Sequence, residues 1–196
     1  MKLKALTLPD VEQVRQWRND CLQALRTPFL LTAEMQENFY RDIICNRNAR
    51  ARYWGIWEEI ETTSTECFLG EGEIVHFGSE KAVKLFKLIG MVGMENIEWE
   101  NRLAEISIIL NPEYQGKGYG EKAVDLLLDQ GFNYLNLENI WGECYKCNPA
   151  LSFWRKICGK YIGYTTILPK RKYWEGTYHD SLYFNINKSN FEGARE

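Results

Sequence analysis

One stretch of the chain, residues 104–132, limits its fold more than any other. It reads AEISIILNPEYQGKGYGEKAVDLLLDQGF. The first seven residues are mostly apolar and β-branched, with Glu105 and Ser107 between them, which predicts a strand more than half buried in a sheet. Asn111 and Pro112 then end the strand, because proline lacks the N–H that a ladder needs and favours extended geometry in the residue before it.

A glycine-rich turn joins this strand to a predicted helix. Gly116, Gly118 and Gly120 allow positive φ and close approach of a ligand, so that consecutive N–H groups can point at one anion. Lys117 and Lys122 add positive charge beside the positive end of the helix dipole. Apolar residues then recur at the spacing of one helix face: Val124, Leu127, Leu128 and Leu135. The stretch predicts phosphate or pyrophosphate binding, although such a turn also occurs as a plain connection.

The residues around this turn exclude two common nucleotide-binding loops. The chain contains no G-x-x-x-x-G-K-[ST] sequence. The turn also does not follow the first strand of a G-x-G-x-x-G dinucleotide-binding unit. The ligand of the turn must therefore be inferred from the residues that flank it.

Gln115-x-x-Gly118-x-Gly120, after a strand that ends in Asn111-Pro112-Glu113, resembles the [Q/R]-x-x-G-x-[G/A] pyrophosphate loop of the GNAT superfamily of acyl-CoA-dependent N-acetyltransferases. Further segments resemble the RimJ/RimL-like branch in the same order. They are Trp17-Arg18-Asn19, residues 88–93 and 99–102, Asn148-Pro149-Ala150 and residues 176–180. Residues 58–86 and the end of the chain lie outside the resemblance.

The resemblance implies an α/β (α+β) fold of GNAT type. Its central sheet is mixed, mainly antiparallel and splayed at the core strand, with helices on both faces. Residues 1–187 are expected to form a single domain, with residues 58–86 inserted between two strands and residues 188–196 as a C-terminal tail.

Composition agrees with one cytoplasmic domain. The 196 residues are 45% hydrophobic, enough for one core, and a net charge of −3 without a dense basic block argues against a nucleic-acid partner. No apolar run reaches the roughly twenty residues that span a bilayer, and the N-terminus lacks a signal-peptide core, so no membrane partner is expected. The six cysteines should be free thiols in a reducing compartment. The sequence leaves open whether the chain forms a homodimer.

The rest of the chain predicts short alternating elements. Alternation and turn signals favour strands at residues 2–8, 53–57, 86–94, 139–145, 161–168 and 178–186. Helical spacing favours helices at residues 9–24, 32–44 and 151–159, with Thr32 capping the second and Asn148-Pro149 starting the third. Residues 67–77 fit either an added strand or a folded loop.

The resemblance also implies acetyl-CoA as the cosubstrate. In the family, the pantetheine arm enters the gap between the core strand and the strand at residues 139–145. A backbone N–H of the core strand can polarise the thioester oxygen without any special side chain. The residues expected to bind the cosubstrate are Ile108, Ile109, Leu110, Gln115, Gly116, Lys117, Gly118, Tyr119, Gly120 and Asn148.

Catalysis needs a proton acceptor, because an alkylammonium has a pKa near that of lysine, about 10.4, and only the neutral amine attacks. Glu105 lies where related enzymes often carry a carboxylate for this purpose, and a structural ion pair is its alternative role. The family's usual proton donor is a tyrosine in the helix after the splayed strand, but Phe153-Trp154-Arg155 occupy that region. Tyr145 and Tyr178 are possible substitutes. Direct transfer in a ternary complex is expected, since no activated cysteine is evident.

Arg18, Asn19 and Phe29 lie in the region that the family turns toward the acceptor, and we expect them to contact it. The expected acceptor is a small-molecule amine such as an amino sugar, a polyamine or an antibiotic. A protein N-terminal amine and a non-catalytic module that binds acyl-CoA remain as alternatives. No metal site is predicted, because Cys144-x-x-Cys147 lacks a second pair of ligands.

Overall fold

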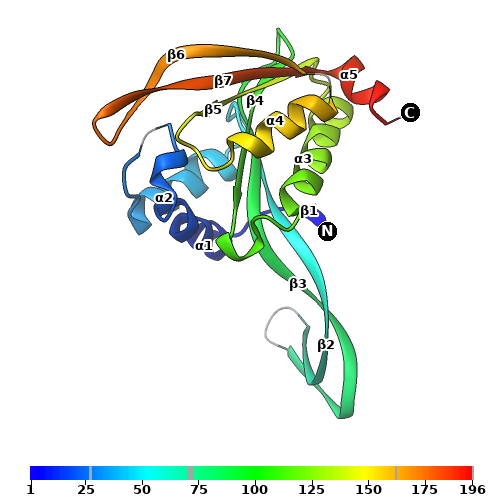
Figure 1. The fold of residues 1–196 in the computed structure, drawn as a ribbon. Helices are drawn as coiled ribbons and strands as arrows, with labels where there is room; N and C mark the ends of the chain where they lie inside the picture. The colour runs from blue at the N-terminus through cyan, green and yellow to red at the C-terminus, as the bar shows by residue number, and fades with distance from the viewer. Residues whose placement is uncertain (27, 70–72, 162, 196) are drawn as a thin grey trace.

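The computed structural model describes residues 1–26, 28–69, 73–161 and 163–195, and the side chains of all of these except residues 62–83. Within this part of the chain, seven strands form one sheet in the order β1-β2-β3-β4-β5-β7-β6 (Figure 1). The strands are β1 (Lys2–Lys4), β2 (Arg52–Leu69), β3 (Glu73–Glu98), β4 (Leu103–Leu110), β5 (Asn139–Tyr145), β6 (Tyr164–Trp174) and β7 (Thr177–Asn187).

The pairing of β4 with β5 gives the sheet its shape. The other described neighbours are antiparallel, whereas β4 and β5 are parallel. Their register covers only residues 103–105 opposite residues 139–141. Past this point the two strands separate. The prediction of a mixed, mainly antiparallel sheet that is splayed at the core strand is confirmed.

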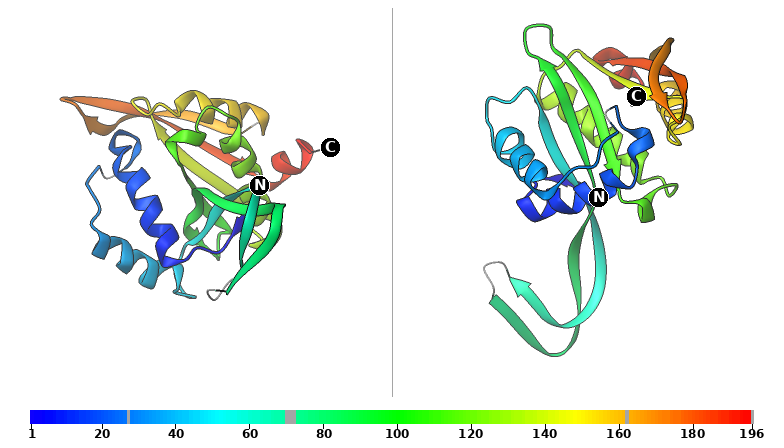
Figure 2. Two further views of the ribbon diagram at one scale, coloured as in Figure 1. Left: turned by 90° about the horizontal axis from the view of Figure 1, so that it is seen from below. Right: turned by 90° about the vertical axis from the view of Figure 1, so that its left-hand side faces the viewer.

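Helices cover both faces of the sheet, as expected (Figure 2). One face carries α1 (Leu8–Asn19) and α2 (Ala33–Phe39). The other carries α3 (Tyr119–Asp129), α4 (Leu151–Lys160) and α5 (Lys188–Gly193). Short helical turns lie at residues 22–24, 40–44, 112–114 and 130–134.

Each face has its own hydrophobic core, because side chains alternate between the two faces along a strand. Met91 of β3 packs with Val14 and Trp17 of α1. Val92, the next residue, points the other way and packs in the cluster that contains Leu127 of α3. The functional elements described below are therefore held by packing on both sides of one sheet.

The first two helices begin at side-chain caps. The Thr7 N–H donates to the Asp10 carboxylate at 2.7 Å in a capping box, and Thr32 accepts the Met35 N–H at 3.3 Å. α1 ends at Asn19, however, earlier than residue 24. After Asn19 the backbone changes to tighter turns, in which the Cys21 N–H donates to the Arg18 carbonyl at 3.2 Å and the Ala24 N–H to the Cys21 carbonyl at 2.9 Å. The carbonyls of residues 22, 23 and 25 then bind a lysine of β6, a contact that no local pattern reveals.

β2 and β3 continue as a two-stranded ribbon far beyond the body of the sheet (Figure 1). Their register runs from Glu61 opposite Lys84 to Leu69 opposite Glu73. The strands expected at residues 53–57 and 86–94 are therefore much longer than expected, and residues 58–86 extend them. Within residues 67–77 the described backbone is strand, while residues 70–72 lie outside the description. The sequence did not predict this length, because strands that pack against no core need not show the alternating apolar residues on which the prediction relied.

Two element ends differ from expectation. α4 begins at Leu151, so Pro149 lies before the helix and not in its first turn. Asn148 instead accepts the Ala150 N–H at 2.8 Å in the preceding turn. Residues 188–193, expected to be part of a tail, form α5.

Phe191 of α5 is 1% exposed, and its ring lies 5.3 Å from that of Phe132. We expect Phe191→Ala to lower the free energy of unfolding by about 3–5 kcal/mol, because it leaves a cavity in the core. Urea denaturation measures this. Phe29→Ala, at a side chain that is 49% exposed, should cost less than about 1 kcal/mol. Equal losses in the two variants would show that α5 is not part of the core.

Candidate active site

The turn between β4 and α3 presents open backbone at the start of a helix. Gly116 (φ +71°) and Gly118 (φ +83°) both have positive φ, and a side chain at either position would meet nothing within 4 Å. Gly118 is the N-cap of α3, and no side chain caps the first turn. The N–H groups of that turn and the helix dipole fit an anion such as a pyrophosphate.

Gly120 has a different local role from the one expected. It lies inside α3 without positive φ, and a Cβ there would come within 3.1 Å of the Phe153 ring. The expectation that positive φ is needed at Gly120 is therefore wrong. Its missing side chain lets α3 and α4 pack closely.

The second half of β4 has strand pairing on one side only. The Asn111 N–H donates to the Ile89 carbonyl of β3 at 2.9 Å, so the backbone groups of Ile108 and Leu110 face away from β3 by alternation. β5 has diverged there. The Leu110 carbonyl accepts a hydrogen bond from the Gln115 side chain at 3.2 Å, and the N–H groups of Ile108 and Leu110 have no strand partner among the described residues.

The remaining predicted cosubstrate residues lie on β4, on the turn and the start of α3, and after β5. Tyr119 donates a hydrogen bond to Glu58 at the root of the β2–β3 ribbon. Lys117 is exposed on the turn, and Asn148 follows the end of β5. The Ile109 side chain packs into the core under α1 and α2, so only its backbone is near the gap.

Glu105 is 7% exposed, and both of its carboxylate oxygens are bound. One oxygen pairs with Arg26, and the other accepts a hydrogen bond from the Asn96 side chain at 2.8 Å. Burial raises the pKa of Glu105 and outweighs Arg26 and Asn96, which lower it. A buried carboxylate with a raised pKa holds a proton more readily near neutral pH than an exposed one.

Two further carboxylates share this face, since residues paired between neighbouring strands point the same way. Glu95 of β3 pairs with Glu105. Glu143 of β5 accepts hydrogen bonds from Arg171 at 2.9 Å and from Ser181 at 2.6 Å. Burial would raise the pKa of Glu143, but Arg171 and Ser181 hold it below its ordinary value.

Arg26 lies between α1 and α2 and joins two of these carboxylates. Its guanidinium pairs with Glu105 and lies 4.0 Å from Glu143. Just before it, the carbonyls of residues 22, 23 and 25 accept hydrogen bonds from the Lys172 ammonium at 3.4, 2.6 and 2.6 Å. Lys172 is 5% exposed. β6 thereby fixes the segment that carries Arg26.

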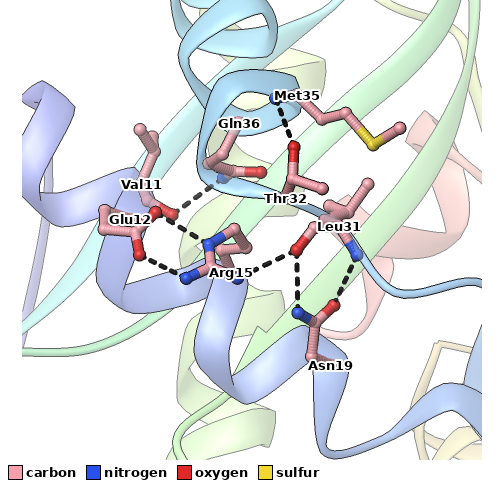
Figure 3. Close-up of polar contacts among 8 residues, drawn as sticks. All are labelled: Val11, Glu12, Arg15, Asn19, Leu31, Thr32, Met35 and Gln36. Atoms are coloured by element: carbon pink, nitrogen blue, oxygen red, sulfur yellow. Dashed lines mark hydrogen bonds and ion pairs between the residues drawn. The ribbon is translucent and has the colours of Figure 1, made fainter.

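The other end of this segment is anchored to α1 (Figure 3). The Asn19 amide exchanges two hydrogen bonds with the Leu31 backbone, at 2.9 and 3.0 Å, and Arg15 donates to the same Leu31 carbonyl at 2.9 Å. Arg18 lies 5.6 Å from the Phe29 ring, and burial lowers its pKa. Of the three residues predicted to contact the acceptor, Arg18 and Phe29 lie together, while Asn19 holds the segment.

The tyrosines named as proton donors occupy different environments. Tyr145 is 5% exposed at the end of β5 on the Glu105 face, and burial raises its pKa. Tyr178 is 62% exposed at the start of β7, next to Tyr173. Trp154 stacks on Phe184 with ring centroids 4.8 Å apart, so it belongs to the core.

The cysteines offer no activated nucleophile among the described side chains. Five of them are free thiols. Burial raises the pKa of Cys144 to about 12 and that of Cys158 to about 11, so both stay protonated at neutral pH.

Sequence reasoning missed Arg26, Asn96 and Lys172. Arg26 is 79 residues from Glu105 in the chain, and no motif links them. The one usable signal was Glu105 itself, because a carboxylate in a buried strand needs a partner. That argument predicts a cation but does not say which one.

Comparison with known proteins gives a family, relatives and a fold. A family model described as acetyltransferase (GNAT) domain matches residues 1–152. The spermidine N(1)-acetyltransferase of Vibrio cholerae is 38% identical over 72 residues, which are 37% of this chain and 42% of that protein. The Escherichia coli K12 enzyme of the same name is 41% identical over 69 residues, 35% of this chain and 37% of that protein. The match thus spans less than half of these relatives.

The solved structures extend the likeness to the whole chain at the level of fold. The crystal structure of spermidine N-acetyltransferase from Vibrio cholerae in complex with CoA and spermine matches with a TM-score of 0.72 at 22% identity, over 97% of both chains. In this chain, no helix within the described residues is long and apolar enough to cross a membrane.

Gly118→Val should abolish CoA binding, because it adds a branched side chain and strains a backbone with positive φ. Isothermal titration with CoA measures the affinity. Gly176→Val is a matched control, since Gly176 (φ +80°) is equally open but lies in the β6–β7 turn. Unchanged CoA affinity in Gly118→Val would show that the turn is not part of the CoA site. An equal loss of affinity in Gly176→Val would show that the effect is not specific to this turn.

Arg26→Gln should raise the pKa of Glu105 further, because it removes an interaction that lowers this pKa while burial remains. Carbon-13 NMR of the Glu105 carboxyl group across a pH titration measures the shift. Arg171→Gln is the control and should leave the titration of Glu105 in place, since Arg171 binds Glu143. An unchanged Glu105 titration in Arg26→Gln would show that the pair does not form in solution.

Proposed function

The chain belongs to the acetyltransferase (GNAT) family, and from this premise we propose that it transfers an acetyl group from acetyl-CoA to a primary amine of a small molecule. The proposal rests on one observation: the unpaired edge of β4 and the open glycine turn lie on the same strand. β4 loses its neighbour at residue 106 and ends in the open glycine turn of α3. A thioester and a pyrophosphate can therefore be bound along the same strand.

The residues that would hold acetyl-CoA are the turn and the free half of β4. The N–H groups from Gly116 to Gly120 would bind its pyrophosphate, and Lys117 would add positive charge there. Acetyl-CoA, when bound, supplies the acetyl group as a thioester. The N–H groups of Ile108 and Leu110 point into the gap and would polarise the thioester carbonyl.

Glu105 is the proposed proton acceptor. Burial raises its pKa and so makes it a stronger base than an ordinary carboxylate, while Arg26 opposes that rise. Tyr145 is the proposed proton donor to the leaving thiolate, because it is buried at the end of β5 and carries its proton. Tyr178 is too exposed on the hairpin to fit this role as well.

The acceptor is proposed to be a small molecule, as it is in the relatives named for spermidine acetylation. The RimJ/RimL-like segments of the sequence leave a protein N-terminus as the competing acceptor. Arg18 and Phe29 would form one wall of the acceptor site.

We expect thiol release from acetyl-CoA when the protein is supplied with a panel of spermidine, glucosamine, an aminoglycoside and a peptide with a free N-terminus. Turnover with at least one small amine, and none with the peptide, is the expected result. Binding of CoA by calorimetry without release against the whole panel would contradict the proposal and favour a non-catalytic module.

Glu105→Gln should keep CoA binding, lower kcat by about 10²–10⁴-fold and remove the acidic limb of the pH–rate profile. Glutamine is nearly isosteric, so packing is preserved. A purely structural ion pair would instead show as a change in the free energy of unfolding with little change in rate. Near wild-type turnover from about pH 6 to 9 would place the base elsewhere.

A further inference from the structure

Lys172 of β6 carries a buried ammonium whose hydrogen-bond partners, among the described residues, are all backbone carbonyls. It is 5% exposed and donates to residues 22, 23 and 25. No carboxylate within the described residues pairs with it, and burial lowers its pKa. An apolar side chain or a neutral donor could join β6 to this segment with a smaller desolvation cost. Packing alone therefore does not account for the charge.

The carbonyls that Lys172 binds lead directly into Arg26. The Leu25 carbonyl belongs to the peptide group that joins Leu25 to Arg26, and it accepts one of the two shortest bonds, at 2.6 Å. The Arg26 side chain is 51% exposed, so its own packing orients it weakly, and a long side chain has many rotamers. Fixing the backbone before Arg26 limits the positions that its guanidinium can reach.

The Arg26 guanidinium contacts both groups to which we assign proton transfer. It pairs with Glu105, and it interacts with the Tyr145 hydroxyl, which lowers the pKa that burial of Tyr145 raises. The position of one side chain therefore affects both the proposed acceptor and the proposed donor of the proton.

Lys172 also contacts the proposed proton donor directly. Its ammonium lies 5.1 Å from the ring centroid of Tyr145 and 5.1 Å from that of Trp174. A cation at this distance from a ring is attracted to it. Lys172 thus joins the Arg26 segment to the end of β5.

The other side chains that hold this segment act more weakly or further from Arg26. The Cys147 thiol lies 3.8 Å from the Gln23 carbonyl, and a thiol is a weak donor. Asn19 binds Leu31 at the far end of the segment. Lys172 is therefore the side chain best placed to fix Arg26.

We propose that Lys172 is a positioning residue of the active site, which places the Arg26 guanidinium on Glu105 and supports the Tyr145 ring. It acts on Glu105 through Arg26. The chemical roles of Glu105 and Tyr145 rest on the proposed function, whereas the placement of Arg26 rests on the contacts of Lys172 alone.

Glu105 also interacts with titratable groups on the surrounding strands or shares Arg26 with them. They are Tyr53 of β2, Glu95 of β3, Glu143 of β5 and Tyr183 of β7. None of them forms a hydrogen bond or ion pair with Lys172 in the part of the chain that the structure describes. The titration of Glu105 can therefore report on what Lys172 does to Arg26.

Lys172→Met removes the ammonium and keeps a side chain of similar length. The pKa of Glu105 should rise, because Arg26 is less often in place to lower it, and carbon-13 NMR of the carboxyl group measures this. Lys146→Met is the matched control and should leave the titration unchanged, since the Lys146 ammonium binds Asp180 at 2.8 Å. Lys172→Gln gives the same comparison if Lys172→Met does not fold.

A double variant separates positioning from a direct effect of the lysine charge. In the Arg26→Gln background, Lys172→Met should move the titration of Glu105 no further. If the shifts of the two single variants add, Lys172 acts on Glu105 by its own charge and the proposal is wrong. An unchanged titration in Lys172→Met alone would also overturn it.

Turnover distinguishes the failure of this proposal from the failure of the proposed function. With an amine that the wild-type protein acetylates, the acidic limb of the kcat profile should move to higher pH in Lys172→Met, together with the titration of Glu105. A titration that moves in a protein that acetylates no amine would support the positioning and contradict the proposed function. Acetylation with a titration that does not move would do the reverse.

Discussion

The structure depends on the place where β5 stops pairing with β4. Three residues of parallel pairing fix the register, and Glu105 is the last of them on β4. From residue 106 onward, one edge of β4 has no strand neighbour among the residues that the structure describes, and buried backbone groups need partners. The same strand thus offers a carboxylate at its start, free N–H groups in its middle and an anion-binding turn at its end, over about 17 Å.

Tight packing on one face of the sheet and polar contacts on the other lie beside the place where the two strands separate. Gly142 of β5 has no room for a Cβ, which would lie 2.3 Å from the Phe184 ring and 2.9 Å from Ile106. On the opposite face, Lys172 binds the carbonyls that precede Arg26. A nearly buried ammonium is costly without partners, and these carbonyls supply them. The segment that carries Arg26 is therefore fixed by β6.

Local patterns predicted the parts of the site that are contiguous in sequence. The strand, the glycine turn and the helix at residues 104–132 follow from periodicity and glycine chemistry. Trp154 stands in the region where the resemblance implies a tyrosine, and the group that replaces that proton donor stays a prediction. Arg26 and Lys172 were missed, because their partners lie 79 and about 150 residues away. Phe191 was missed for another reason: one apolar residue in a short polar segment has no period, although it completes the core.

The charges on the Glu105 face also bear on which amines the site can favour. Three carboxylates, Glu95, Glu105 and Glu143, lie among three guanidinium groups, those of Arg18, Arg26 and Arg171. An amine that binds Glu105 or Glu143 competes with the arginine already paired with that carboxylate, and the exchange of one cation for another yields little net energy. Arg26 therefore lowers the pKa of Glu105 and also competes with the ammonium of an acceptor for that carboxylate.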